Sequence, residues 1–333
     1  MGLSYPLEAL SRPLPWQTSA WQQTQRANTN GRLAHALLLS GSDGTGRNQF
    51  AIALARQLLC TEASEAGNCG QCKGCELTRR GAHADLATLM PVEPGKSIGI
   101  DAVRGLLNFA AKTSSLGLRK VILVSPLEAM TTNAFNAFLK GLEEPGDDSY
   151  FLLVYGRGQR IPATVRSRCQ TLQLPEPTRA SARDWLDAAL ADNDLSGQGA
   201  EALLDLAADK PLRALAYAAR DDLASLRGLQ GALEQLAADG NKAPVLAAAA
   251  GIAPLQLLEQ LQIDLQARLR GLARSGKLVD LRGPLGALET LTALRVAQLS
   301  GSNPNPDLLR FSALDAYASA CEALQRDGKL VAI

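Results

Sequence analysis

Four of the six cysteines lie close together, in the pattern Cys60-x8-Cys69-x2-Cys72-x2-Cys75. Cysteines separated by two residues present both sulfurs to one ion, and four thiolates form the tetrahedral kind of site that binds Zn²⁺. In a long cytosolic chain, such a cluster indicates a metal site more than a disulfide framework, with redox chemistry as the alternative. Four protein ligands leave no open coordination position, so the spacing predicts one structural zinc ion. His83 is interpreted as a structural residue outside this cluster.

A second pattern is a glycine-rich loop, in which Gly41, Gly44 and Gly46 precede Arg47 and Asn48. The loop follows an apolar run typical of a strand and precedes a helical pattern, which is the context of a phosphate-binding loop. Such a loop needs a lysine for the phosphates and a Ser or Thr hydroxyl for magnesium. An arginine and an asparagine are poor substitutes for these groups. We therefore expect a degenerate loop with no functional ATP site.

The acidic residue that should accompany a working phosphate loop is also missing. Magnesium and the attacking water need a carboxylate at the end of a later strand, but the strand pattern starting at Val121 ends in Ser125 and Pro126. Glu143 and Glu144 could replace it, although an acidic helix end before a proline is more often a solvated turn. Two independent losses predict that the chain does not hydrolyse ATP.

Two arginines stand in the segment that leads into the last apolar run of this region. Arg166 and Arg168 are either solvated surface residues or one of them reaches across a subunit interface into a neighbour's nucleotide site. A guanidinium in that position stabilises the charge that develops on a transferring phosphoryl group. The spacing alone does not choose between the two arginines.

The elements that position these residues follow from hydrophobic periodicity. Between residues 30 and 175, short apolar runs alternate with helical patterns, which predicts an α/β fold with a parallel sheet. The runs are 36–40, 86–90, 120–125, 150–155 and 169–174, and the intervening helical patterns include 49–59, 100–112 and 131–143. Pro175 and Pro177 interrupt the chain, and the pattern beyond them is helical.

Composition agrees with several domains in one chain. The chain has 333 residues, which is too long for one ordinary core. Its residues are 46% hydrophobic and 20% charged, and a net charge of +1 excludes a free-standing, strongly basic DNA binder. We divide the chain into residues 1–174 with an inserted zinc module at 60–75, a small helical domain at 175–218 and a C-terminal helical domain at 219–333. Without a membrane-length apolar run or a leader pattern, we expect a cytoplasmic protein.

Together these motifs resemble the delta prime family of clamp-loader subunits of bacterial DNA polymerase III, which belong to the AAA+ class. The resemblance covers about residues 30 to 175. It rests on the glycine loop and the four-cysteine module together with Arg-Leu-Ala-His-Ala at 32–36, Asn-Ala-Phe-Leu-Lys-Gly-Leu-Glu-Glu-Pro at 136–145 and Ser-Arg-Cys at 167–169.

The resemblance implies a P-loop AAA+ domain, a small helical lid and a C-terminal helical bundle that joins an oligomeric collar. It implies a non-hydrolysing stator that works with gamma or tau and delta subunits to place the sliding clamp on primed DNA during replication. In this family the arginine carried onto Arg168, with Ser167 and Cys169 completing the motif, is the arginine finger for a neighbouring ATP site. The second-sensor arginine of the motor subunits corresponds here to Leu212, beside Arg213.

Two other functions remain open at this point. An ATP-hydrolysing motor of the gamma/tau type predicts hydrolysis by the isolated chain that is lost on Arg47→Ala. A zinc-dependent nucleic-acid-binding module predicts salt-sensitive DNA affinity of the chain alone, because phosphate contacts release counterions.

Overall fold

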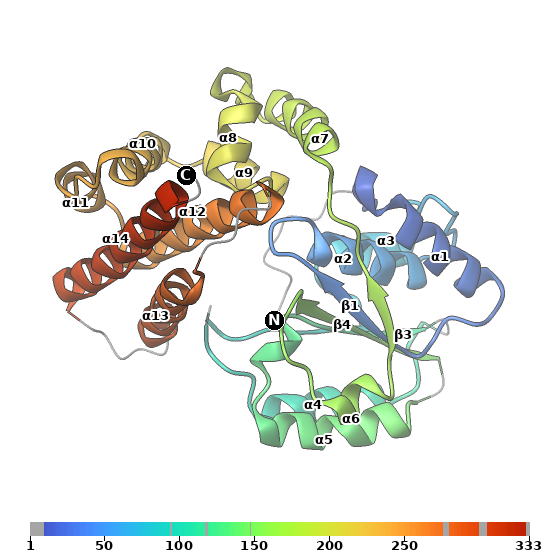
Figure 1. Cartoon of the computed structure of the whole chain (residues 1–333). Helices are drawn as coiled ribbons and strands as arrows, with labels where there is room; N and C mark the ends of the chain where they lie inside the picture. Colours follow the sequence, from blue (N-terminus) through green and yellow to red (C-terminus); the bar gives the residue numbers. More distant parts are fainter. Residues whose placement is uncertain are drawn as a thin grey trace. The chain divides into compact units, whose positions relative to one another are not determined.

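The computed structural model describes residues 10–93, 95–116, 119–146, 148–275, 280–299 and 305–330. The expectation that the chain has no leader pattern rests on residues 1–9, which lie outside these residues, as do residues 300–304. The chain forms two compact units, Met1–Trp185 and Leu186–Ile333 (Figure 1), called here the first and the second unit. The finer division at residues 174 and 218 stays a prediction.

The first unit is built on a parallel sheet of five strands in the order β2-β3-β4-β1-β5. Every residue of β1 and β3 is buried, as expected of strands covered on both faces. The strands are β1 (Ala36–Gly41), β2 (Leu86–Leu89), β3 (Lys120–Val124), β4 (Ser149–Gly156) and β5 (Gln170–Gln173). All five predicted strands are therefore confirmed.

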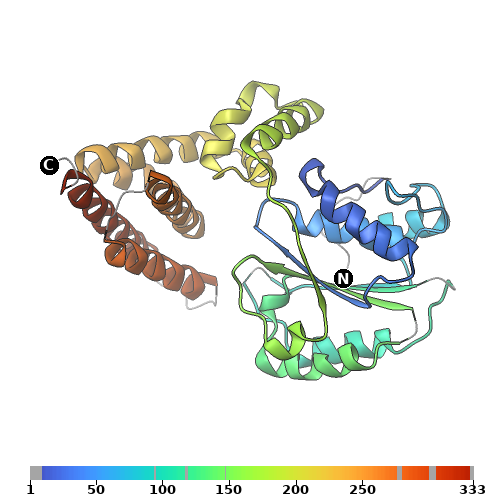
Figure 2. The same ribbon diagram turned by 45° about the vertical axis from the view of Figure 1, so that its right-hand side comes forward.

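Helices cover the two faces of this sheet, as Figures 1 and 2 both show. Successive strand residues point to opposite faces, so Leu37 and Leu39 join one core cluster while Ala36 and Leu38 join the other. The first face carries α1 (Thr18–Thr29), α2 (Arg47–Leu58) and α3 (Lys73–Arg79), and the second carries α4 (Ile100–Ala110), α5 (Thr132–Glu143) and α6 (Ala163–Arg166). The expected α/β fold with a parallel sheet is confirmed.

The second unit consists of helices, and the structure describes no strand after β5. The helix α7 (Arg179–Asp192) leads into it, and its long helix α10 (Leu223–Asp239) ends at Gly240 in the left-handed conformation, with φ of 77°. The others are α8 (Ala200–Leu206), α9 (Pro211–Ala218), α11 (Ala243–Ala249), α12 (Pro254–Ser275), α13 (Arg282–Leu299) and α14 (Pro306–Leu330). The predicted helical region is confirmed. No described helix is both long and apolar enough to cross a membrane.

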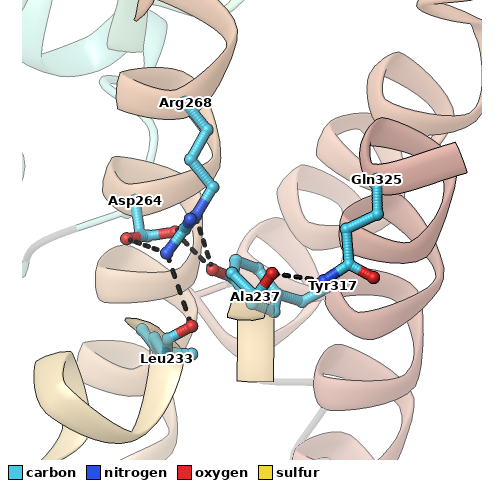
Figure 3. Close-up of polar contacts among 6 residues, drawn as sticks. All are labelled: Leu233, Ala237, Asp264, Arg268, Tyr317 and Gln325. Carbon is cyan, nitrogen blue, oxygen red and sulfur yellow. Dashed lines mark hydrogen bonds and ion pairs between the residues drawn. The ribbon is translucent and has the colours of Figure 1, made fainter. Parts of the chain in front are cut away.

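A polar cluster joins three helices of the second unit (Figure 3). Arg268 of α12 donates from Nη2 to Asp264 Oδ1 at 3.2 Å, from Nε to the Tyr317 hydroxyl of α14 at 3.2 Å, and from Nη2 to the carbonyl of Leu233 in α10 at 3.4 Å. The Tyr317 hydroxyl donates to Asp264, and Gln325 donates to the Ala237 carbonyl. Burial and the charge of Asp264 raise the pKa of Tyr317. The cluster therefore fixes α12 against its two neighbours.

Replacing Asp264 with alanine is expected to destabilise the second unit. It leaves the largely buried Arg268 without its carboxylate, at a cost of about 2 kcal/mol, between the values for exposed and fully buried pairs. Asp307→Ala is the matched control, because Asp307 pairs with Arg310 while its own side chain is 91% exposed. Urea unfolding of the full chain measures the free energy of unfolding of both variants, and hydrogen exchange of α12 measures the local effect. Equal effects would show that the cluster adds nothing beyond a surface ion pair.

Candidate functional site

The glycine loop connects β1 to α2 in the way that a phosphate-binding loop requires. Gly44 and Gly46 have φ values of 73° and 91°, and residues other than glycine rarely adopt positive φ values. A Cβ at Gly46 would lie 2.1 Å from Leu14 Cδ1, so any larger residue there would displace the Leu14 side chain and strain the backbone as well. The expected strand, glycine loop and helix are therefore present, and glycines occupy the loop positions with positive φ.

The side chain of Arg47 lies along the loop itself. Its Nη1 donates to the carbonyl of Gly41 at 3.2 Å, and Nη2 lies 3.8 Å from Asp43 Oδ1. Only 15% of the side chain is exposed, and Nε has no partner among the described residues. The guanidinium is thus directed at protein acceptors of the loop that it follows.

Asn48 and Ser125, which occupy the two positions that would hold magnesium in a working site, are hydrogen-bonded to each other. The Ser125 hydroxyl donates to Asn48 Oδ1 at 2.7 Å, joining the end of β3 to the first turn of α2. An amide and a hydroxyl paired in this way offer no carboxylate to a metal ion or to an attacking water. The structure thus brings together the two substitutions that the sequence identified separately.

Glu128 is an acidic residue near the loop that the sequence analysis did not single out. It belongs to a short 3₁₀ helix, η2 (Leu127–Ala129), and its Oε1 accepts the N–H of Gly156 at 3.0 Å. A Cβ at Gly156 would lie 3.0 Å from both this oxygen and Arg47 Nη1. An acidic residue four positions beyond the end of the buried strand β3 is the signal that could have identified it.

The loop is held by residues on both of its sides. Trp16 Nε1 donates to the Thr45 carbonyl at 2.9 Å, and Gln17 Nε2 donates to the Gly46 carbonyl at 2.9 Å. Both residues belong to another 3₁₀ helix, η1 (Pro15–Gln17). The Ser42 hydroxyl donates to Glu176, which also pairs with Arg157. These contacts give the loop a fixed conformation supported by the protein itself.

Arg168 follows the short helix α6, and its side chain contacts Glu143, the Thr164 carbonyl and Ser167 Oγ. Its Nε and Nη2 lie 2.9 and 2.6 Å from Glu143 Oε1, at the end of α5, and Nη1 donates to the Thr164 carbonyl at 2.8 Å. The side chain is 36% exposed. The sequence placed Glu143 in a solvated turn and did not predict this pairing. Arg166, the other candidate, donates only a long 3.4 Å hydrogen bond to the Ile161 carbonyl.

The remaining residues of the arginine motif have structural contacts. Ser167 Oγ donates to the Thr164 carbonyl at 3.1 Å. Cys169 is partly buried and packs against the core on the α5 side of the sheet, and burial raises the pKa of its thiol to about 11. In the second unit, Arg213 Nη2 lies 3.7 Å from Glu259 Oε1, and Leu212 beside it is half-buried.

The four cysteines of the predicted metal site come together. Their sulfurs all lie within 4.8 Å of one another, with 3.7 Å between those of Cys60 and Cys72 and 3.9 Å between those of Cys69 and Cys75. A tetrahedral site with Zn–S bonds of about 2.3 Å separates its sulfurs by about 3.8 Å. The geometry therefore fits one zinc ion.

Each of these sulfurs also lies within reach of a backbone N–H. The N–H groups of Cys69, Cys72 and Cys75 point to the sulfurs of Cys60, Cys69 and Cys72 at 3.3, 3.4 and 3.5 Å. The sulfur of Cys75 accepts from the N–H of Gly70 and from Asn68 Nδ2, both at 3.3 Å. Such donors stabilise thiolates, the form that a metal ion requires. His83 is not part of the cluster, and its Nδ1 accepts the N–H of Asp85 at 3.1 Å.

Comparisons with known proteins agree on one group of relatives. A family model described as "DNA polymerase III, delta subunit" matches residues 16–178. The DNA polymerase III subunit delta prime of Pseudomonas aeruginosa is 42% identical over 60% of this chain, and that of Escherichia coli K12 is 34% identical over 70%. The matched regions span 60% and 69% of those two proteins. The DNA polymerase III subunit tau of Salmonella typhimurium is 32% identical over 55% of this chain and 28% of its own length.

Proposed function

This chain belongs to the family of the DNA polymerase III delta prime subunits, and on that premise we propose that it is a clamp-loader subunit that hydrolyses no ATP itself. In this proposal it supplies Arg168 to the ATP site of a neighbouring subunit. The observation that carries the proposal is a contrast within the first unit. The chain's own loop pairs Asn48 with Ser125 where a motor needs magnesium ligands, whereas Arg168 presents an accessible guanidinium.

The contacts around the loop support the proposed loss of hydrolysis. Lysine would place a compact ammonium among the phosphates, whereas Arg47 donates to the loop's own carbonyl at Gly41. A hydroxyl at position 48 would hold magnesium, whereas Asn48 accepts a hydrogen bond from Ser125. With neither group available, the nucleotide loses both its charge neutralisation and its metal.

The exposure and the geometry of Arg168 support its proposed role. Arginine fingers act in trans because the fixed, always charged guanidinium enters a site that another subunit builds. Arg168 is accessible, and Glu143 and the Thr164 carbonyl restrict its conformations. The neighbour in this proposal is a gamma or tau subunit, and the complex also contains delta. The sliding clamp and primed DNA are reached through the complex, in the cytoplasm.

We also assign one structural zinc ion to Cys60, Cys69, Cys72 and Cys75. When bound, zinc supplies cross-links among α2, the module and α3, and no reaction step depends on it. The AAA+ domain of the proposal ends near residue 174. A small lid at 175–218 and a collar at 219–333 complete it, with the collar as the part that oligomerises.

A motor of the gamma/tau type is the second candidate, favoured by the similarity to the tau subunit over 55% of this chain. We expect the purified chain to release no phosphate from Mg-ATP above background, with the same result for Arg47→Ala. A motor would instead hydrolyse ATP and lose that activity on Arg47→Ala. Phosphate release with DNA present decides between the two, with a tau subunit as positive control.

A further inference from the structure

Arg56 of α2 is the largest fully buried side chain that the structure describes, with 1% of its surface exposed. Removing a guanidinium from water is costly unless charge and hydrogen bonds in the protein compensate for the lost hydration. Burial of Arg56 is therefore favourable only if negative charge or hydrogen-bond acceptors lie close to its guanidinium.

The described contacts place Arg56 directly against the cysteine module. Nε donates to Thr78 Oγ1 at 3.2 Å, and Nη2 donates to the carbonyl of Cys75 at 3.4 Å, both in α3. Nη1 donates to Ser11 Oγ at 2.6 Å. One guanidinium thus connects α2, the metal-binding helix and the N-terminal segment, and it lies beside a cysteine of the cluster.

The charge of the loaded cluster complements this guanidinium. Four thiolates and one Zn²⁺ carry a formal charge of −2, because the thiolates contribute −4 and the metal +2. Burial lowers the pKa of Arg56, whereas the charges of Cys75 and Cys60 act in the opposite direction. Metal binding requires all four cysteines as thiolates, and a guanidinium beside them favours that form of the ligands.

We propose that Arg56 is the buried countercharge of the metal-loaded four-cysteine centre and stabilises the loaded form over the metal-free form. The inference rests on the proposed zinc ion. Arg56 is not a ligand: it acts through the charge of the cluster and through its hydrogen bonds to Ser11, Cys75 and Thr78. Replacing residues that hold metal ligands in place in this way typically weakens metal binding by about 10- to 100-fold.

The test compares zinc affinity in the full chain for Arg56→Gln, Arg56→Lys and Arg80→Gln. Arg80→Gln removes the same charge from the end of α3, the helix that carries Cys75, but Arg80 is 66% exposed and pairs with Glu76. We expect Arg56→Gln to weaken zinc binding by about 10- to 100-fold in chelator competition. Arg56→Lys, which keeps the charge, should bind several-fold more tightly than Arg56→Gln. Arg80→Gln should stay within about twofold of the unchanged protein, because water screens exposed charges.

Release of zinc to a chromogenic chelator is measured on the loaded proteins and needs no folded metal-free form, and it should be faster for Arg56→Gln than for Arg80→Gln. Equal affinities and equal release rates for these two variants would overturn the role of Arg56 alone. So would an Arg56→Lys variant that binds zinc as weakly as Arg56→Gln. An unchanged protein that binds no zinc would instead overturn the zinc assignment, and this inference with it.

Discussion

Replacing Arg168 with alanine is expected to lower ATP turnover at the adjoining site of a reconstituted clamp loader by about 10³-fold, the lower end of the range for arginine fingers. Assembly of the complex should not change, because the side chain is exposed and lies outside both core clusters of the first unit. DNA- and clamp-stimulated phosphate release measures the effect. Sites that do not face this chain retain their turnover, so single-turnover measurements resolve the affected site.

The size of this effect depends on how readily Arg168 exchanges its partner. Its ion pair with Glu143 is exposed on both sides, at 36% and 49%, and pairs of this kind contribute no more than about 1 kcal/mol. A bound triphosphate carries more charge than one carboxylate and attracts the guanidinium more strongly. The pair therefore orients the finger without preventing its transfer to the neighbouring phosphate.

Arg166→Ala is the matched control, because Arg166 lies two residues away with one long hydrogen bond to a backbone carbonyl. The ATP turnover of a complex that contains Arg166→Ala should stay within about twofold of that of the complex with the unsubstituted chain. A large loss for Arg166→Ala with none for Arg168→Ala would assign the finger to the other arginine. No loss for either variant would leave the chain without a role in hydrolysis.

Cys75→Ser is expected to remove the zinc ion and to destabilise the first unit. Cys75 is buried, and its sulfur accepts from Gly70 and Asn68. Metal analysis should fall from about one zinc per chain to near zero. The unfolding free energy should fall by about 3–5 kcal/mol, less than the 10–16 kcal/mol of zinc-finger peptides, because two hydrophobic cores also support this unit.

Cys169→Ser provides the comparison, since Cys169 lies outside the cluster. It should keep one zinc per chain and lose only about 1 kcal/mol of stability, as expected for a partly buried thiol replaced by a hydroxyl. Identical zinc contents in the two variants, or a metal-free unchanged protein with the same stability, would contradict the structural zinc site.

The first four strands could be predicted because each is a short, mostly apolar run. The strand β5 is mostly polar, and the run 169–174 that placed it ends in the buried Leu172 and Leu174. Periodicity also placed α2, α4 and α5 to within a few residues. The helix α1 was missed because its sequence is mostly polar, and it is fixed instead by packing of Trp21 against Phe50, with ring centroids 5.6 Å apart. The helix α3 could not be predicted because its short sequence contains Gly74 and Cys75, which do not favour a helix. Cys72 caps it by accepting the N–H of Cys75.

The chemical character of the candidate sites could be predicted, but most side-chain partners could not. Spacing identified the cysteine cluster because its ligands are local in sequence. Ser125 lies 77 residues from Asn48, and Glu143 lies 25 residues from Arg168. These pairs depend on where the folded sheet brings the ends of its strands and helices. Arg56 escaped notice because nothing in its immediate sequence shows that α2 buries it against the cysteine module.

The central claim is that this chain does not hydrolyse ATP yet is required for hydrolysis by its partners. Its most direct test adds the purified chain to tau and delta subunits and measures phosphate release with sliding clamp and primed DNA. We expect no turnover from the chain alone and a strong rise in turnover of the tau and delta mixture when the chain is added. Hydrolysis by the chain alone, or turnover of the mixture that is the same without it, would contradict the account.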